Sequence, residues 1–520
     1  MQTHVHLIEK INALRAMNIT GTLHASLASV PERTDTLRKA VLSLIPQIDI
    51  LHVFLQDFDN IPDFLDHEKI FITRSQDFGK LGECGKYYWI GEFSAFHFMV
   101  SDSYVYPDNY IEIMKGKILE YKKKAVICCG GYKLTEHYES LSSSGKFFTA
   151  SSVSENDFEL EIPDDACMAF HSDTISVSWH HFYQPLLSSV WFAILAKQQN
   201  IPIICISHPG DWIRTSVEKH KNNLEAAGHF TDFLIDAWFN KHEHHFDCSH
   251  INSCFDRIYV MNLDRRNDRW EKLVKRTQKH GINVTRFPAV DGYRELVKSQ
   301  WNKYFNSGII TIPEGIEPIT TFKDKYLNYR HYFTRIHFME TKLGRKAIQS
   351  PGAWGYALSY ISILTEAIRQ KYDRIMILDD DVLLHKDFNQ EFAKRMDFLP
   401  NDWLLIMLGA MQHNWNTPFI DWENDLFYHC HGSSIASHAV GIDKKVFLPI
   451  LFYSEKLDLP IDEGAIYHIQ NVYDKRSYVF YPNLAIQDIV DSDISSSVIA
   501  SDDVEQKSKL FRWDFTKYDL

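Results

Sequence analysis

Ile375-Met376-Ile377-Leu378-Asp379-Asp380-Asp381 is the stretch that decides the fold, because an apolar run ends there in three consecutive aspartates. A short apolar run bounded by charge is typical of a buried strand in a parallel sheet. In open α/β sheets, ligands bind beyond the carboxyl ends of the strands. We therefore predict a binding site at this end of the strand.

The three carboxylates indicate which ligand the site holds. They repel one another unless a cation is bound, and an Asp-x-Asp pair holds Mg²⁺ or Mn²⁺ while substrate phosphates complete the coordination. The metal then neutralises a diphosphate as it leaves. The sequence therefore indicates a divalent-metal site at these aspartates. The alternative is a solvated acidic turn before a helix that begins near Phe388.

The sequence around this stretch indicates two α/β regions. In the second half, a strand at 257–263, a helix at 270–280 and a strand at 282–287 follow one another, which is typical of a parallel sheet. The first half alternates similar runs, among them strands at 51–55 and 125–128.

A chain of 520 residues is too long for one ordinary domain. We expect four parts, which are an N-terminal domain at 1–215, a helical linker at 216–253, a C-terminal domain at 254–500 and a tail at 501–520.

Composition excludes several classes of protein. A net charge of -13 argues against nucleic-acid binding, although a few arginines suffice to bind a small diphosphate. We expect no signal peptide and no transmembrane segment. The eight cysteines are scattered, which favours reduced thiols and a cytoplasmic location. The aromatic tail at 510–515 either contacts the inner membrane surface peripherally or packs against a domain.

Five motifs of the second half resemble glycosyltransferase family 25, the family of bacterial lipopolysaccharide and collagen galactosyltransferases. The segment 352–360 is similar to the family's Gly-x-x-Gly-Cys-x-Leu-Ser-His, with Tyr356 and Tyr360 in place of Cys and His. The other four are the strand and loop 258–270, Ala289-Val290-Asp291-Gly292, residues 378–382 with Asp379 in place of Glu, and Ser437-His438-Ala439.

This resemblance implies a GT-A fold, a nucleoside-diphosphate sugar donor and Mn²⁺ or Mg²⁺ as cofactor. It assigns Asp379 and Asp381 to the metal, and it implies that the donor contacts Asn262 and Leu263 through their backbone, Arg265 or Arg269, Asp291, Gly292 and Asp380. The alternative for the arginines is a solvated, charged helix start.

An inverting transferase needs a base that deprotonates the acceptor hydroxyl. In inverting GT-A enzymes the base usually lies in the part of the chain that here holds Asp462 and Glu463, at a predicted helix start after Pro460. We predict Asp462 as the base and Glu463 as its substitute. Capping of the helix by Asp462 is the alternative.

The first half resembles a second GT-A domain, of family-2-like glycosyltransferases, at residues 25–37 and 74–88. Those relatives carry three aspartates where this sequence has Ser101-Asp102-Ser103, and an Asp where Ser189 stands. A hydroxyl is a poorer ligand than a carboxylate for a hard dication. We expect this domain to be non-catalytic; the alternative is a second active, metal-independent transferase.

Taken together, the sequence predicts an α/β protein with two GT-A-like, Rossmann-like domains. The predicted activity is metal-dependent, inverting transfer of a hexose, galactose first, from a UDP-sugar to a cell-surface glycan such as lipooligosaccharide. The alternatives are a protein acceptor of the collagen hydroxylysine type, a bifunctional enzyme and a non-catalytic glycan-binding scaffold.

Overall fold

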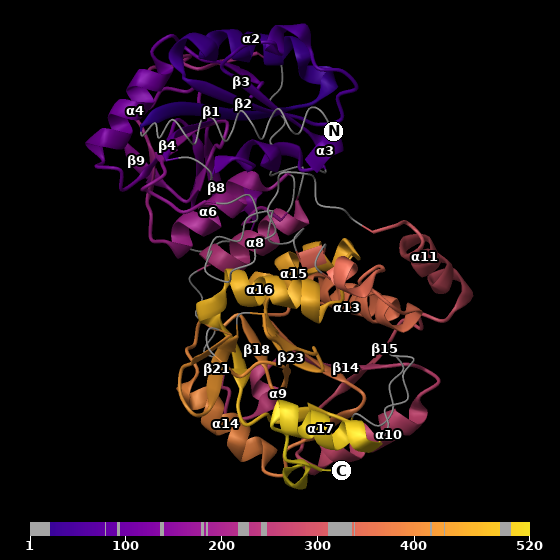
Figure 1. Cartoon of the computed structure of the whole chain (residues 1–520). Coiled ribbons are helices and arrows are strands. Elements are labelled where there is room, and N and C mark those ends of the chain that lie inside the picture. The colour runs from indigo at the N-terminus through magenta and orange to yellow at the C-terminus, as the bar shows by residue number, and fades with distance from the viewer. Residues whose placement is uncertain are drawn as a thin grey trace. The chain divides into compact units, whose positions relative to one another are not determined.

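The computed structural model describes residues 21–519 except 79, 91–93, 136–139, 178–180, 184–185, 217–227, 241–246, 310–334, 337–338, 417–418, 431 and 489–500. The chain divides into two compact units at residues 241 and 242, inside the segment expected to be a linker. Each unit contains one large sheet covered by helices (Figure 1).

The N-terminal sheet has eight strands in the order β3-β2-β1-β4-β11-β6-β12-β9. β11 and β9 run antiparallel to their neighbours, and the other pairs are parallel. The strands are β1 (Thr22–Ser29), β2 (Ile50–Leu55), β3 (Ile70–Arg74), β4 (Ala95–Val100), β6 (Val126–Cys128), β9 (Phe158–Leu160), β11 (Cys167–His171) and β12 (Ile203–Cys205).

The C-terminal sheet also has eight strands, in the order β15-β14-β16-β23-β18-β24-β21-β20. Its strands are β14 (Arg257–Asn262), β15 (Thr285–Pro288), β16 (Arg374–Asp379), β18 (Leu405–Met407), β20 (Ile420–Trp422), β21 (Phe427–Cys430), β23 (Ala439–Asp443) and β24 (Ser477–Phe480). The strands predicted at 257–263 and 375–378 are β14 and β16.

The two sheets share one topology. The succession β2-β1-β4-β11-β6-β12-β9 matches β15-β14-β16-β23-β18-β24-β21 strand for strand, with the fourth and last strands antiparallel to the rest in both. The prediction of two Rossmann-like α/β domains is confirmed.

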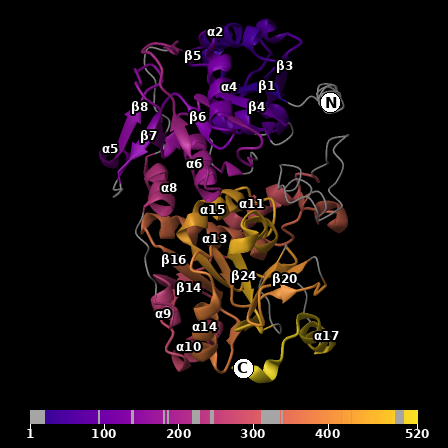
Figure 2. The same ribbon diagram turned by 90° about the vertical axis from the view of Figure 1, so that its left-hand side faces the viewer.

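Helices cover both faces of each sheet (Figures 1 and 2). In the N-terminal unit, α2 (Thr34–Leu44) buries Leu37, Val41 and Leu44 at helical spacing against the sheet, together with α4 (Tyr110–Glu120). α6 (Ser188–Gln198) covers the other face, where Phe192 contacts Phe170.

In the C-terminal unit, α9 (Ile251–Cys254), α10 (Asn267–Lys279) and α14 (Phe388–Phe398) pack on one face of the sheet. α13 (Pro351–Arg369), α15 (Phe447–Glu455) and α16 (Tyr467–Val472) lie on the other (Figure 1). The helix predicted near Phe388 is α14.

The predicted linker and tail are parts of the two units in the described residues. α8 (His229–Phe239), from the linker, packs against α6. In the tail, Phe511, Trp513 and Tyr518 are buried, and they pack on β17 (Val382–Leu384) and β25 (Ala485–Gln487) after α17 (Ser501–Phe511). These rings therefore do not form a membrane-contacting surface.

The expectation that all cysteines are reduced is wrong for one pair. Cys248 and Cys254 form a disulfide at the start of the C-terminal unit, whereas the other six cysteines are free and buried. Among the described residues, no helix is both long and apolar enough to cross a membrane.

Candidate active site

The site is built where β14 and β16 end side by side. These strands are parallel neighbours with Met261 opposite Asp379, so the polar residues that follow both strands meet at one edge. Asp380 and Asp381 are each only 8% exposed. The solvated acidic turn considered from the sequence is therefore ruled out.

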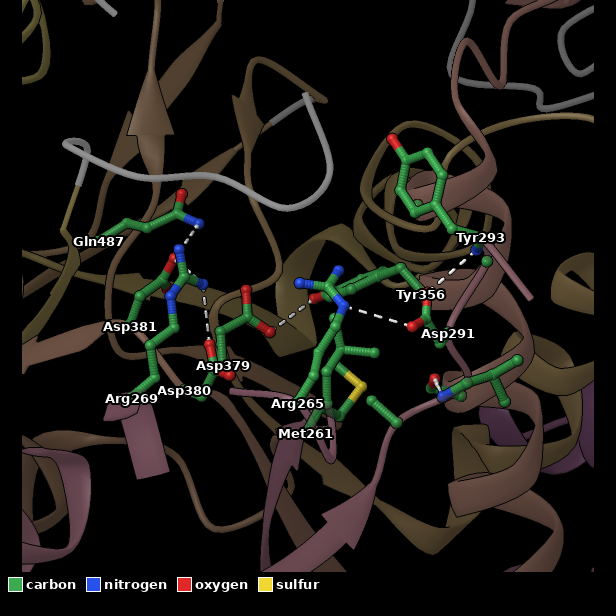
Figure 3. A pocket seen from close by; sticks show the side chains of 16 residues that line it. Met261, Arg265, Arg269, Asp291, Tyr293, Tyr356, Asp379, Asp380, Asp381 and Gln487 are labelled. Atoms are coloured by element: carbon green, nitrogen blue, oxygen red, sulfur yellow. Dashed lines mark hydrogen bonds and ion pairs between the residues drawn. The ribbon is translucent and has the colours of Figure 1, made fainter. Parts of the chain in front are cut away.

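A pocket opens at this edge (Figure 3). All the predicted donor and metal residues line it except Asn262. The lining residues are Met261, Leu263, Arg265, Arg269, Ala289, Val290, Asp291, Gly292, Tyr293, Gly352, Tyr356, Ser359, Asp379, Asp380, Asp381 and Gln487. The prediction for Asn262 is corrected: it is fully buried behind the pocket, and its carbonyl accepts a hydrogen bond from Ala289 N.

Two glycines bring the loop 289–292 against the start of α13. A Cβ on Gly292 would lie 1.6 Å from the carbonyl oxygen of Pro351, and one on Gly355 would lie 2.3 Å from that of Val290. Ser359 Oγ secures the contact by accepting a hydrogen bond from Val290 N at 2.9 Å. Only glycine permits this approach, which explains why the two motifs occur together.

Asp379 is held from the α13 side. The Tyr356 hydroxyl lies 3.0 Å from Asp379 Oδ1, 3.0 Å from Ser437 Oγ and 3.2 Å from the Ser437 carbonyl oxygen. Burial raises the pKa of Asp379 above its ordinary value, and the charges of Asp381 and Asp380 raise it further. The tyrosine in place of the family's cysteine thus orients one predicted metal ligand.

Arg269 bridges the other two aspartates (Figure 3). Its Nη1 donates to Asp380 Oδ1 at 3.0 Å and to Asp381 Oδ2 at 3.4 Å, and Gln487 Nε2 also lies 3.4 Å from Asp381 Oδ2. Burial raises the pKa of Asp381 to about 7; Arg269 opposes this rise and Asp380 adds to it.

One carboxylate oxygen of the site is available to a cation. Asp381 Oδ1 is buried and has no hydrogen-bond partner among the described residues, and a buried carboxylate oxygen without a partner is unfavourable unless a cation or donor reaches it. Within the described ranges, no three His, Cys, Asp or Glu side chains form a complete metal site. Oxygens from a donor diphosphate would have to complete the coordination of Asp379 and Asp381.

The opposite wall of the pocket carries a cation and an anion. Arg265 Nε donates to Asp291 Oδ2 at 3.3 Å, and Asp291 Oδ1 accepts a hydrogen bond from Tyr293 N at 3.0 Å (Figure 3). The Arg265 side chain is 45% exposed, so it reaches the open space of the pocket. Asp291 keeps this guanidinium against the loop.

Asp462 and Glu463 do not line the pocket. They begin a π-helical turn, η8 (Asp462–Ile466), whose N-cap is Ile461. Asp462 Oδ1 accepts a hydrogen bond from Glu463 N at 3.1 Å, so the carboxylate bonds to the start of the helix without occupying the N-cap position. Asp462 Oδ2 accepts a hydrogen bond from Ala436 N at 2.8 Å, and Glu463 pairs with Arg335 at 2.6 Å. Burial raises the pKa of both carboxyls.

The corresponding residues of the N-terminal unit are buried and bond to one another. Asp102 is fully buried, and it accepts hydrogen bonds from Ser29 Oγ at 2.6 Å and Arg33 Nη1 at 3.1 Å. Ser101 and Ser103 are buried beside it and bond to each other through Ser103 N and Ser101 Oγ. Ser189 lies in the first turn of α6 and is half-buried.

Comparison with known proteins finds a family match for part of the unit that holds this pocket. Residues 255–439 match the model of glycosyltransferase family 25 (LPS biosynthesis protein). The resemblance of the C-terminal half to family 25 is therefore confirmed. The family-2-like resemblance of the N-terminal half stays a prediction.

Individual relatives in family 25 are distant and are matched in part. Procollagen galactosyltransferase 2 of Mus musculus is 27% identical over 161 residues, 30% of this chain and 21% of the relative. The human protein of that name is 28% identical over 158 residues, with the same shares. Probable inactive glycosyltransferase 25 family member 3 of Rattus norvegicus is 22% identical over 49% of this chain and 41% of the relative. The chain thus matches a fifth to two fifths of these relatives.

Sequence reasoning missed three side chains that shape the pocket. Tyr293 follows a quoted motif but has no pattern of its own, and Gln487 lies 106 positions from Asp381, to which it bonds. Tyr356 was noted only as a departure from the family motif. That departure was the available signal, because a large polar residue that replaces a small one beside a buried strand must find a hydrogen-bond partner there.

Proposed function

We propose that the C-terminal unit transfers a hexose from a UDP-sugar to a glycan hydroxyl. Galactose is our first candidate for this hexose. The family-25 match supports a glycosyltransferase, and the pocket at Asp379, Asp380 and Asp381 carries the argument for the donor. Asp379 and Asp381 would hold Mn²⁺ or Mg²⁺, which supplies Lewis-acid assistance to the departing diphosphate. Arg265 is exposed to the pocket and can pair with a phosphate.

We assign the acceptor base to Asp462, with inversion at the anomeric carbon. Burial raises its pKa above the ordinary value, and a raised pKa makes the carboxylate a stronger base. Glu463 is the weaker candidate because its carboxylate is engaged in an ion pair with Arg335 at 2.6 Å. Asp462→Asn should abolish transfer but keep UDP binding, whereas Glu463→Gln should keep measurable transfer; the reverse pattern makes Glu463 the base.

The acceptor that we propose first is a cell-surface glycan such as lipooligosaccharide, which agrees with the description of the family model. A protein hydroxyl of the collagen hydroxylysine type is the second candidate, because two relatives are named procollagen galactosyltransferases. A cytoplasmic location stays a proposal, which the six free cysteines favour and the Cys248–Cys254 disulfide opposes. Transfer of radiolabelled galactose to lipooligosaccharide or to hydroxylysine-containing peptide separates the two acceptors.

The decisive experiment is nucleotide release from a panel of UDP-sugars with Mn²⁺. We expect one donor to be hydrolysed by the wild type and by Asp102→Asn, and not by Asp381→Ala. Asp102→Asn is the matched control, because it alters the equivalent strand end of the N-terminal unit. Unchanged turnover in Asp381→Ala, or loss in Asp102→Asn with the fold intact, places the chemistry elsewhere and refutes the proposal.

A further inference from the structure

The two units share an arrangement of three side chains at the same place in the sheet. In the C-terminal unit, Asn262 Nδ2 donates to Asp380 Oδ2 at 2.7 Å, and Arg269 Nη1 donates to Asp380 Oδ1 at 3.0 Å. The central aspartate is thus bonded through one oxygen to a strand end and through the other to an arginine.

In the N-terminal unit, Asp102 makes the same pair of contacts. Ser29 Oγ donates to Asp102 Oδ2 at 2.6 Å, and Arg33 Nη1 donates to Asp102 Oδ1 at 3.1 Å. Arg33 Nη1 also lies 3.5 Å from Ser103 Oγ. The 3.4 Å contact of Arg269 with Asp381 is its counterpart. We call each set of aspartate, arginine and strand-end residue a clamp.

Strand register explains why both clamps form. Ser26 pairs with Met99, which brings Ser29 level with Asp102, and Met261 pairs with Asp379, which brings Asn262 level with Asp380. The arginine comes in both units from the turn or helix that directly follows the first strand. The clamp is therefore a property of the shared topology.

The N-terminal unit has the clamp without the carboxylates that we assign to metal and donor binding. Ser101 and Ser103 replace the outer carboxylates there, so that edge lacks the ligands a metal-diphosphate needs. The arginine is nevertheless bonded to the central aspartate, which is fully buried. Because the Arg33–Asp102 pair is present where the outer carboxylates are absent, we infer that it stabilises this edge of the sheet and does not depend on a metal or a donor.

We propose that Asp380 and Arg269 are positioning residues that fix the two strand ends, and that neither of them binds the donor. The inference rests on the proposed function for its donor part. It leaves Asp379 and Asp381 as the metal ligands and Arg265 as the phosphate contact. Arg269 acts on the donor through Asp381, whose Oδ2 it holds.

The test compares Arg269→Gln, Arg269→Gln/Asp380→Asn and Arg265→Gln in the full chain. Arg269→Gln leaves a buried charge without its cation, so amide exchange in peptides covering β14 and β16 should speed up roughly 100-fold. The affinity of Arg269→Gln for UDP with Mn²⁺, measured by calorimetry, should also fall. The neutral double variant should recover most of both losses, because its amides restore a hydrogen-bonded clamp without charge.

Arg265→Gln should weaken UDP binding and leave amide exchange unchanged. Arg33→Gln should speed up amide exchange in β1 and β4 alone, and the double variant Arg33→Gln/Asp102→Asn should restore slow exchange there. Loss of UDP affinity in Arg269→Gln without faster exchange, or absence of rescue by Asp380→Asn, overturns the proposal and makes Arg269 a donor ligand. Absence of UDP binding by the wild type overturns only the proposed function, because the exchange data need no ligand.

Discussion

Gly292→Ala tests whether the floor of the donor pocket depends on the contact between the loop 289–292 and α13. The added Cβ would lie 1.6 Å from the Pro351 carbonyl oxygen, whereas ordinary contacts begin near 3.4 Å. The loop must therefore retreat by about 2 Å, and both atoms in conflict belong to backbone or to a fixed Cβ. Overpacking of this kind typically costs about 1–3 kcal/mol.

The displacement also reaches the donor site. Asp291 precedes Gly292 and holds Arg265, so a shifted loop moves the guanidinium that we assign to the diphosphate. Misplacement by about 1 Å commonly costs about 100-fold in rate. We expect UDP affinity, measured by calorimetry with Mn²⁺, to fall at least about tenfold, together with the melting temperature.

Gly116→Ala is the matched control. Gly116 lies in α4 of the other unit, where a Cβ would have no neighbour within 4 Å. This change should stabilise the protein by up to about 1 kcal/mol through helix propensity, without effect on UDP binding. If Gly292→Ala binds UDP like the wild type and melts no lower, the inferred packing of the loop is wrong.

Three further predictions concern titration and packing. Burial lowers the pKa of His24 and of His52 to about 3, so near pH 5 the unfolded chain binds protons that the folded chain does not bind. The free energy of unfolding should therefore be at its full value above pH 6.5 and roughly 4 kcal/mol lower at pH 5. Urea titration of the wild type and of His52→Gln at the two pH values measures this difference. Asp381→Asn should stabilise the ligand-free protein by roughly 2–4 kcal/mol at pH 8, and this gain should be absent at pH 4. The reason is that the pKa of Asp381 is raised to about 7 in the folded protein, so the buried carboxylate destabilises the fold once the pH exceeds the pKa of the unfolded chain. A melting temperature at pH 8 equal to that of the wild type contradicts this. Trp513→Ala should cost about 3–5 kcal/mol, because it empties a buried site and leaves Asn483 without its indole donor, and calorimetric unfolding that matches the wild type would contradict the packing.

The sequence predicts those features that follow from local pattern. The apolar run before Asp379 identified β16, and the topological rule for parallel sheets identified the pocket edge. The strand at 257–263 was also predicted within one residue. These succeed because a buried strand and its polar end are contiguous in the chain.

Contacts between segments that are distant in the chain could not be predicted from the sequence. Asn262 was expected to contact the donor through its backbone, but the residue is fully buried, and its side chain bonds to Asp380, 118 positions away. The bond from Arg335 to Glu463 and the burial of Trp513 likewise depend on tertiary packing. The Cys248–Cys254 disulfide was missed, because a spacing of six residues carries no distinctive signal.

The burial of Phe511, Trp513 and Tyr518 against β17 and β25 has a consequence for biosynthesis. β17 directly follows Asp381, and its partner strand and aromatic cover come from more than 100 residues later in the chain. At roughly 5–20 residues per second, a ribosome leaves this edge incomplete for several seconds after the aspartates emerge. The nascent chain therefore exposes an unpaired, apolar strand beside three carboxylates during that interval. Chaperone occupancy during translation should be highest over this part of the chain.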